Sequence, residues 1–320
     1  MKSTRTFMST LEEDVFSGLT AYPKKLPSKY IYDKTGDELF QKIMDMPEYY
    51  LTRAEFQILK KHKEKLSKVF DAFGGFDLIE LGAGDGKKTK ILLKHFMEKG
   101  LDFHYTPIDI SQNVLDSLKA SLKEELPGLQ VTSRQGMYFK VLQDLAGYNK
   151  RRKIIMVLGS NIGNLMHKKA IDFLKNIRDS MGEDDLLFMG FDQKKHPQVI
   201  LDAYNDNTGI TAAFNKNLLV RINRELDADF EPDNFLHWET YNPETGTAKS
   251  FLVAKEPMTV QLKKISLEVH FKAWETIHTE ISQKYDDDTV RWLAGQSDLV
   301  ITEIFGTDDE AYKNYIFKRR

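Results

Sequence analysis

The sequence predicts an α/β fold, in which a doubly wound, mainly parallel sheet is interrupted by an inserted α+β domain. Two observations support this prediction. From about residue 76 to 192, short apolar runs alternate with segments of helical periodicity, as is typical of parallel βαβ units. From 196 to 284 this alternation stops, and a helical stretch is followed by several strands with alternating character.

The apolar runs of the alternating region are expected to form the strands of the sheet. Two further runs follow near the C-terminus, separated by a short loop, and they suit a sheet that ends with an antiparallel strand. The expected strands are FDLIEL (76–81), FHYTPIDI (103–110), LQVTSR (129–134), KIIMVLGS (153–160), DLLFMGFD (185–192), LVITEIFG (299–306) and YKNYIFKR (312–319).

The segments between these runs have helical periodicity, and the clearest is SQNVLDSLKASLKEEL. Val114, Leu115, Leu118 and Leu122 fall on one stripe of such a helix. Ser111 stands where its hydroxyl can accept a hydrogen bond from the first turn. A helix is therefore predicted between the second and third runs.

The insertion is predicted to begin with a helix, since Phe214, Leu218 and Ile222 follow one another at four-residue spacing. The strands expected after this helix are HWETYN, TAKSFLVA, MTVQLKKI, SLEVHF and TIHTEIS. The first 55 residues also lie outside the α/β alternation and are rich in turn signals. No internal repeat or low-complexity linker separates the parts, so we expect them to pack as one body.

Composition excludes several classes of function. The 46 basic and 48 acidic residues give a formal net charge of −2, which offers no reason to expect a nucleic-acid partner. Without cysteine there can be no disulfide, thiolate metal site or cysteine nucleophile, and without an H-E-x-x-H motif a zinc site is not expected. No leader or membrane-spanning run is recognisable. A cytoplasmic monomer without a membrane or nucleic-acid partner is therefore expected.

The stretch LIELGAGDGKKT (78–89) contains the main candidate for a cofactor site. Small residues after a buried strand allow close approach of a ligand, and the following helix offers free N–H groups. Gly82, Gly84 and Gly86 are spaced G-x-G-x-G, whereas dinucleotide loops are spaced G-x-G-x-x-G. With Glu80 before them, they resemble the first motif of S-adenosylmethionine-dependent methyltransferases.

Two other features agree with a nucleoside cofactor. Lys87 and Lys88 suggest an anionic group on the ligand, and Asp109 at the end of the second strand can accept hydrogen bonds from two ribose hydroxyls. The alternatives are an ordinary strand–helix turn with a capping acid, or hydride transfer from a nicotinamide.

Four longer stretches identify a family. They are KKLPSKYIYDKTGDELFQKIMDMPEYYLTRAEFQIL (24–59), VLGSNIGNL (157–165), AYNDNTGITAAFNKN (203–217) and TEISQKY (279–285). Together they resemble the histidine-specific Nα-methyltransferases of ergothioneine biosynthesis, which produce the betaine hercynine. The resemblance implies a Rossmann-like class I methyltransferase core at 56–194 and 285–320. It also implies a substrate-binding domain formed by 1–55 and the insertion at 195–284.

The resemblance also implies roles for individual residues. It places Tyr32 beside the substrate amine, Asn164 and Tyr204 at the α-amino and α-carboxylate groups, and Glu280 and Ser282 at the imidazole. The cofactor-side positions that it implies are Tyr49, Gly82, Gly84, Lys88, Asp109, Met137, Tyr138 and Gly159.

The residue types at the imidazole positions are chemically reasonable. Glu280 and Ser282 are two apart in a predicted strand, so both side chains fall on one face. A carboxylate and a hydroxyl can bind the two nitrogens of an imidazole and would be left unpaired by other side chains. From periodicity alone, a solvated strand face is the alternative.

Two positions depart from the family pattern. Met137 replaces the acid that usually accepts the adenine amino group, with Tyr138 next to it, and Ser250 stands where the family's histidine enzymes can have methionine. A small polar residue there could admit a different or larger side chain. The alternatives to histidine methylation are therefore N-methylation of another free amino acid such as tryptophan, or a cofactor-binding protein without catalysis.

Overall fold

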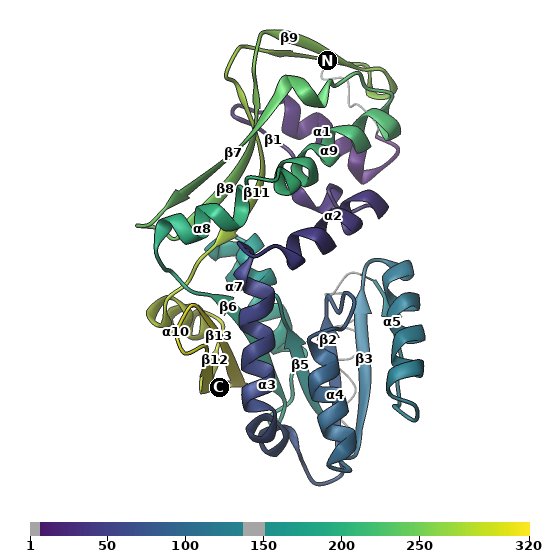
Figure 1. Cartoon of the computed structure of the whole chain (residues 1–320), viewed down its shortest axis with the longest axis vertical. Coiled ribbons are helices and arrows are strands. Elements are labelled where there is room, and N and C mark those ends of the chain that lie inside the picture. Colours follow the sequence, from purple (N-terminus) through teal and green to yellow (C-terminus); the bar gives the residue numbers. More distant parts are fainter. Residues whose placement is uncertain (1–6, 137–150) are drawn as a thin grey trace. The chain divides into compact units, whose positions relative to one another are not determined.

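A computed structural model describes residues 7–136 and 151–320. The chain divides into two compact units, each built from segments that are distant in sequence. The first unit combines the residues up to Tyr50 with Lys195–Ser282, and the second combines Leu51–Lys194 with Gln283–Arg320. In Figure 1 the first unit is purple and green, and the second is blue, teal and yellow.

The second unit contains a sheet in the order β12-β13-β6-β5-β2-β3-β4. The strands from β2 to β6 pair in parallel, whereas β13 runs antiparallel to both of its neighbours. The predicted α/β fold with an antiparallel closing strand is thus confirmed. The strands are β2 (Phe76–Leu81), β3 (Phe103–Asp109), β4 (Arg134–Gln135), β5 (Arg152–Val157), β6 (Leu186–Asp192), β12 (Leu299–Gly306) and β13 (Tyr312–Arg319).

The run LQVTSR was predicted as a full strand, and this prediction is wrong. Only its last residue belongs to β4, which pairs with the end of β3, and an isolated bridge joins Val131 to Tyr105. This segment lies at the edge of the described sheet and has only one neighbouring strand. Half of the cross-strand contacts that stabilise a central strand are therefore missing.

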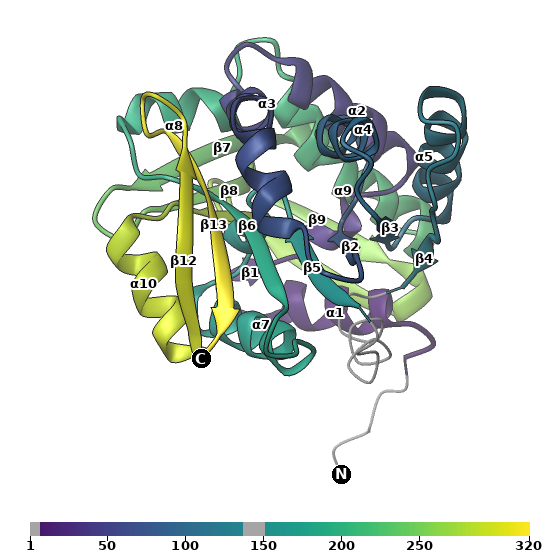
Figure 2. The same ribbon diagram turned by 90° about the horizontal axis from the view of Figure 1, so that it is seen from below.

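Helices cover both faces of this sheet. Figure 2 shows α3 (Tyr50–Phe70), α4 (Thr89–Glu98) and α5 (Gln112–Glu125) on one face, and α7 (His167–Asp179) and α10 (Asp287–Gln296) on the other. The predicted helix is α5, where the Ser111 hydroxyl accepts a hydrogen bond from the Val114 N–H at 3.4 Å. Leu115, Leu118 and Leu122 are buried as expected, so the polar residues of α5 remain on the solvent side.

The centre of this sheet defines where a ligand can bind. From β2 the chain builds outward through β3 and β4, and then crosses back to β5 on the other side of β2. In doubly wound sheets, ligands bind outside the carboxyl ends of the strands where the order reverses in this way. The loops after β2 and β5 are therefore the expected walls of a cofactor site.

The first unit contains a four-stranded sheet in the order β1-β11-β8-β7 and a separate pair, β9 and β10. Its α9 helix buries Phe214, Leu218 and Ile222, as the four-residue spacing predicted. The bounds are α1 (Thr10–Thr20), β1 (Lys24–Lys25), α2 (Lys34–Asp45), α8 (Pro197–Tyr204), α9 (Ile210–Leu226), β7 (Phe235–Asn242), β8 (Thr247–Ala254), β9 (Met258–Leu262), β10 (Leu267–Phe271) and β11 (Thr276–Gln283). Short 3-10 turns lie at Ser28–Tyr30, Pro232–Asn234 and Lys263–Ile265 in this unit, and at Asn161–Asn164 in the second unit.

The described residues contain neither a membrane-crossing helix nor a cluster of metal ligands. None of their helices combines the length and the apolar character that crossing a bilayer requires. Among the same residues, no group of three or more histidine and acidic side chains is arranged to hold a metal ion.

Candidate functional site

The glycine loop leaves β2 in a conformation that explains the alternate spacing of its glycines. Gly82, Gly84 and Gly86 have φ values of 74°, 55° and 67°, which side chains with a Cβ rarely adopt. A Cβ on Gly84 would point into open space, whereas one on Gly86 would lie 2.4 Å from Leu118 Cδ1 on α5. Gly84 therefore leaves room for a ligand, and Gly86 leaves room for a neighbouring helix.

Glu80 on β2 links the end of this loop to the neighbouring strand β3. It is buried and accepts hydrogen bonds from the hydroxyl of Thr89, where α4 begins, and from that of Tyr105 on β3. Burial raises its pKa to about 7, although these hydrogen bonds act in the opposite direction. The acid before the glycines is therefore a structural element of the loop, and no ligand contact needs to be assigned to it.

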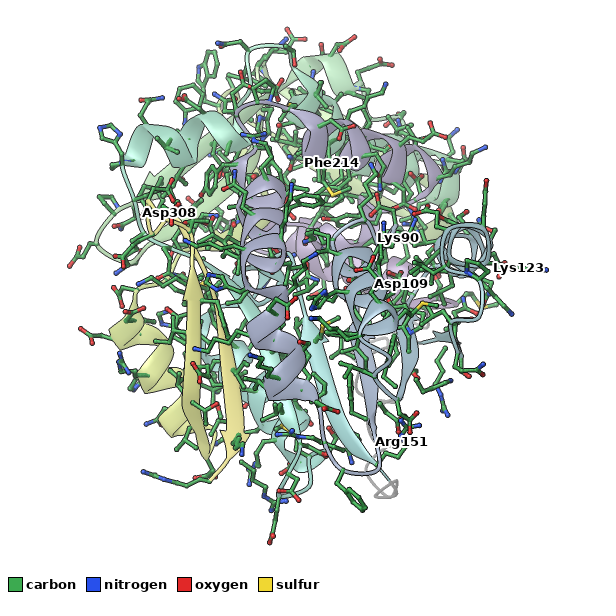
Figure 3. All side chains as sticks on the ribbon, turned by 60° about the horizontal axis from the view of Figure 1, so that its bottom comes forward. Lys90, Asp109, Lys123, Arg151, Phe214 and Asp308 are labelled. Atoms are coloured by element: carbon green, nitrogen blue, oxygen red, sulfur yellow. The ribbon has the colours of Figure 1, made fainter. Side chains whose placement is uncertain are left out.

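Asp109 ends β3 and faces the same loop (Figure 3). One carboxylate oxygen accepts from the Gly84 N–H at 3.3 Å, and the other accepts from the Ser111 N–H at 3.0 Å. Arg151, just before β5, lies at the opposite end of the sheet in Figure 3. The structure thus brings Asp109 and Gly84 together at the carboxyl ends of the strands.

Lys88 and Gly159 are brought together by a residue that the sequence analysis did not identify. Glu55 Oε2 on α3 lies 2.6 Å from Lys88 Nζ and accepts from the Gly159 N–H at 2.7 Å. A Cβ on Gly159, whose φ is 76°, would lie 3.4 Å from Lys88 Nζ. Lys88 is therefore half of an ion pair, and the Gly159 N–H already has an acceptor.

The segment after β5 is held in a tight turn. Ser160 has a left-handed φ of 55°, and its hydroxyl accepts from the Asp192 N–H at 3.0 Å. A Cβ on Gly163 would lie 3.1 Å from the carbonyl oxygen of Gln283. This turn ends at Asn164, whose side chain is exposed. Asn164 belongs to the second unit, so the structure does not group it with Tyr32 and Tyr204.

The remaining amino-acid-side residues gather in the first unit. The hydroxyls of Tyr204 and Ser282 lie 2.9 Å apart and share a hydrogen bond. Burial raises the pKa of the Tyr32 hydroxyl, and the nearby groups of Glu280, Tyr49 and Tyr204 raise it further. Residues from β11, from the end of α8 and from the segment before α2 therefore form one cluster.

Aromatic rings form the apolar part of this cluster. Tyr32 packs edge-on against Phe40 and Phe214 at centroid distances of 5.7 and 5.3 Å. Tyr49 packs against Phe40 and Tyr204 at 6.3 and 6.0 Å. Tyr49 thus lies with the amino-acid-side residues of its own unit, and its predicted cofactor contact stays a prediction.

The environment of Tyr32 keeps its phenol protonated. Burial, and then the negative charge of Glu280, raise the pKa of Tyr32 well above its usual range. Near neutral pH the phenol can donate or accept a hydrogen bond, but it cannot serve as a base.

Two polar residues hold the backbone on either side of Tyr32. Asn217 on α9 donates to the Ile31 carbonyl at 3.0 Å and to the Asp33 carboxylate at 2.8 Å. Arg221 on the same helix donates to the carbonyl of Tyr32 at 3.4 Å. The position of Tyr32 is therefore set by α9.

The run AYNDNTGIT joins Tyr204 to the start of α9. The Asp206 carboxylate accepts from the backbone N–H groups of Ile210 and Thr211 at 3.0 and 2.8 Å. Burial alone would raise the pKa of Asp206, but hydrogen bonds from Thr208 and Thr211 lower it to about 2. A charged Asp206 thus closes the loop that places Tyr204.

Ser250 on β8 lies in a buried hydrogen-bond network next to β11. Its hydroxyl donates to Glu239 at 2.6 Å on the neighbouring strand, and its carbonyl accepts from the Thr279 hydroxyl at 3.1 Å. Thr279 also donates to the Asn215 side chain at 2.7 Å. Ser250 therefore has a partner for its hydroxyl within the protein, next to the strand that carries Glu280.

Sequence reasoning missed Glu55, Phe40, Asn217 and Glu239. Glu55 gave one signal, because it is an acid on a stripe otherwise formed by Leu51, Ala54, Ile58 and Leu59. The other three act through contacts between distant segments and gave no comparable signal. Met137 and Tyr138, predicted on the cofactor side, lie outside the described residues.

The geometry of the second unit fits a nucleoside cofactor with an amino-acid tail. Open space beside Gly84 and an acid at the end of β3 match the needs of a ribose. Lys88 retains N–H donors that Glu55 does not occupy and can offer them to a carboxylate. Because these features come from loops at the strand-order reversal, they form one candidate site within this unit.

Comparison with known proteins identifies the family of this chain. A family model described as "Histidine-specific methyltransferase, SAM-dependent" matches residues 11–319. The chain is 37% identical over 280 residues to a histidine N-alpha-methyltransferase from Mycolicibacterium smegmatis, covering 88% of this chain and 86% of that protein. It is 36% identical to a protein of the same name from Mycobacterium tuberculosis, covering 86% and 84% of the two chains.

A third relative is longer. The ergothioneine biosynthesis protein 1 from Schizosaccharomyces pombe is 28% identical, and the match covers 92% of this chain but 39% of that protein. The chain thus matches two bacterial proteins over most of their length and one part of the yeast protein.

Proposed function

This chain belongs to the family of histidine-specific, S-adenosylmethionine-dependent methyltransferases, and we propose that it methylates free L-histidine on its α-amino nitrogen. The product is Nα,Nα,Nα-trimethylhistidine (hercynine), and the reaction is the first step of ergothioneine biosynthesis. The observation that carries the proposal is the grouping of Tyr32, Tyr204, Glu280 and Ser282 within one unit of a chain from this family.

On the cofactor side, S-adenosylmethionine supplies a methyl group on a positively charged sulfur when it is bound. Asp109 is proposed to accept hydrogen bonds from the ribose hydroxyls, and Lys88 to donate to the methionyl carboxylate. Gly82 and Gly84 allow the loop backbone to approach the ligand, because neither has a side chain in the way.

On the amino-acid side, Glu280 and Ser282 are proposed to bind the two imidazole nitrogens. The Ser282 hydroxyl shares a hydrogen bond with Tyr204. A hydroxyl can donate and accept at the same time, so Ser282 can bind a ring nitrogen while it is bonded to Tyr204. A side chain without a matching donor and acceptor would not form these hydrogen bonds with Glu280 and Ser282, so the pair favours an imidazole.

The α-amino group must lose a proton before it can attack. Tyr32 stays protonated at neutral pH, so its proposed role is to orient the amine while the proton leaves through water. Most of the rate enhancement then comes from alignment and exclusion of water. After three transfers the nitrogen has no lone pair, and aromatic rings such as Tyr32 and Phe214 can stabilise the cation.

Asn164 is proposed to bind the α-amino and α-carboxylate groups of the amino acid, and this role is supported by the family resemblance of the run that contains it.

We further propose that the enzyme is a monomer that acts in the cytoplasm. Light scattering during size-exclusion chromatography tests the first part, and fractionation of cells that produce the chain tests the second.

The test is a screen of the twenty amino acids for methyl transfer, combined with calorimetry using S-adenosylhomocysteine. We expect histidine to be the preferred acceptor and S-adenosylhomocysteine to bind. Preferred transfer to tryptophan would mean that tryptophan, and not histidine, is the acceptor. Binding of S-adenosylhomocysteine without methylation of any amino acid would indicate a protein without catalysis and would refute the proposal.

A further inference from the structure

Glu55 is a fully buried acid on the apolar face of α3. Its carboxylate receives a hydrogen bond from four groups in three other parts of the second unit. Oε2 faces Lys88 Nζ at 2.6 Å and the Gly159 N–H at 2.7 Å. Oε1 faces the Tyr312 hydroxyl at 3.0 Å and the Asn314 amide at 2.9 Å. One side chain therefore joins α3, the glycine loop, the turn after β5 and strand β13.

These four contacts leave Glu55 no capacity to bind a ligand itself. A carboxylate has about four lone-pair positions, and each oxygen of Glu55 accepts two hydrogen bonds. Strand β6 also packs closely against the Glu55 carboxylate, since a Cβ on Gly190 would lie 2.3 Å from both Glu55 Oε1 and the Tyr312 hydroxyl. Glu55 is thus not suited to contact a ligand and must act through its partners.

Two of these partners, Lys88 and Gly159, border the candidate cofactor site. A lysine side chain has a flexible stem and tends to extend into water when its charge has no fixed partner. The Lys88 side chain is 20% exposed and can reach solvent. Glu55 therefore keeps the Lys88 ammonium, which would otherwise extend into solvent, beside Gly159.

We propose that Glu55 is a positioning residue that sets affinity for the amino-acid tail of the cofactor by holding Lys88 and Gly159 in place. This inference rests on the proposed function, because it assigns Lys88 to the methionyl carboxylate. The negative charge of Glu55 opposes a second carboxylate nearby, but its Coulomb effect is offset by the ammonium that it fixes. Without Glu55 the Lys88 ammonium turns toward solvent and no longer offers a fixed donor to the ligand carboxylate, so the net effect is weaker binding.

The test compares two ligands by calorimetry in wild type and E55Q. S-adenosylhomocysteine has an amino-acid tail whose carboxylate corresponds to the methionyl carboxylate, whereas methylthioadenosine retains the adenosine and sulfur without the amine and carboxylate. Glutamine preserves the shape of Glu55 but places an amide nitrogen against one pair of its donors. We expect E55Q to bind S-adenosylhomocysteine about tenfold more weakly or worse and to bind methylthioadenosine within about twofold of wild type.

The matched control is D185N, which removes another buried acid from a lysine pair in the same unit. Asp185 lies 3.0 Å from Lys153 Nζ at the amino ends of β5 and β6, away from the glycine loop. D185N should lower the melting temperature without changing either affinity. If E55Q does not fold, Y312F removes a single hydrogen bond from Glu55 and should give a smaller loss with the same preference between ligands.

The outcomes separate the inference from the proposed function. A loss confined to S-adenosylhomocysteine supports the positioning role. An equal loss for both ligands, or no loss for either, would overturn that role while leaving the methyltransferase assignment intact. Failure of the wild-type protein to bind S-adenosylhomocysteine would overturn the proposed function, and this inference with it.

Discussion

At the scale of single residues, the proposed choice of acceptor depends on two side chains that are two positions apart on β11. Burial, and then the charge of Glu280, raise the pKa of the Tyr32 hydroxyl, and Ser282 is hydrogen-bonded to Tyr204. The resemblance assigns Tyr204 and Ser282 to opposite ends of the amino acid, yet their hydroxyls are partners in this structure. In the proposed function, recognition of the imidazole and of the α-amino and α-carboxylate groups is therefore coupled through this hydrogen bond.

Replacement of Glu280 by alanine tests the role assigned to the ring contact. Loss of one charged hydrogen bond costs about 1.5–3 kcal/mol, which is roughly ten- to a hundredfold in affinity. We expect E280A to weaken histidine binding by that factor and to leave S-adenosylhomocysteine binding unchanged, as measured by calorimetry. Glu275, which pairs with Lys24 in the same unit, provides the control, and E275A should bind histidine normally. Equal weakening of histidine and tryptophan by E280A would contradict the assignment.

At the scale of elements, α9 and α2 hold the segment that carries Tyr32. Asn217 and Arg221 on α9 bind the carbonyl groups of Ile31 and Tyr32. Gly36 on α2 lies against the same segment, where a Cβ would be 1.9 Å from the Ile31 carbonyl oxygen. The glycine in the run DKTGDE is therefore required by close packing.

Substitution of Gly36 by alanine should be strongly destabilising. The added methyl group cannot fit without moving backbone, and such overpacking costs about 1–3 kcal/mol or more. Gly295 on α10 is the control, because a Cβ added there would have no atom within 4 Å; G295A should be stabilising by about 0.5–1 kcal/mol. Urea unfolding measures both changes. A G36A protein as stable as wild type would show that this packing is not needed.

The sequence predicted those features of the fold that depend on local periodicity. Each of these features depends on residues that lie close together in sequence. They include the strands β2, β5 and β6, the cap at Ser111 and the apolar stripe of α9. The edge strand β4 was predicted too long, because its apolar pattern does not report how many neighbours a strand has. Glu55 was missed since its partners, from Lys88 to Asn314, are far from it in sequence.

At the scale of the whole molecule, each unit is closed by segments that are distant in sequence. Inside the second unit, the chain leaving β6 runs beside the chain that follows β11. Lys284 forms a fully buried ion pair with Asp192 at 2.7 Å. The Tyr285 N–H donates to the Asp192 carbonyl, and the Lys194 N–H donates to the Tyr285 carbonyl. Removing one partner of a buried ion pair leaves an uncompensated charge, so this pairing is important for closing the unit.

Acid should destabilise the protein through His237 on β7. This ring is buried, and among the described residues neither of its nitrogens has a hydrogen-bond partner. Burial lowers the pKa of His237 from 6.5 to about 4. Below pH 6.5 the unfolded chain gains a proton on this ring, whereas the folded chain gains it only near pH 4, so stability falls as the pH decreases through that window. The loss from this group is on the order of 3 kcal/mol.

The variant H237L isolates this contribution. Its free energy of unfolding, measured by urea titration at several pH values, should fall less than that of wild type between pH 6.5 and 4. Asp206, whose pKa is lowered to about 2, contributes stability that is lost below about pH 4 in both proteins. Parallel curves for the two proteins between pH 6.5 and 4 would mean that His237 is not the titrating group.

The proposed function requires that the α-amino nitrogen of free histidine accept three methyl groups. Tandem mass spectrometry of the product formed from histidine and S-adenosylmethionine tests this requirement most directly, because fragmentation separates the amine from the imidazole. We expect all three methyl groups on the α-nitrogen and an unmodified ring. Methyl groups on the imidazole, or histidine recovered without any methyl group, would contradict the proposed function.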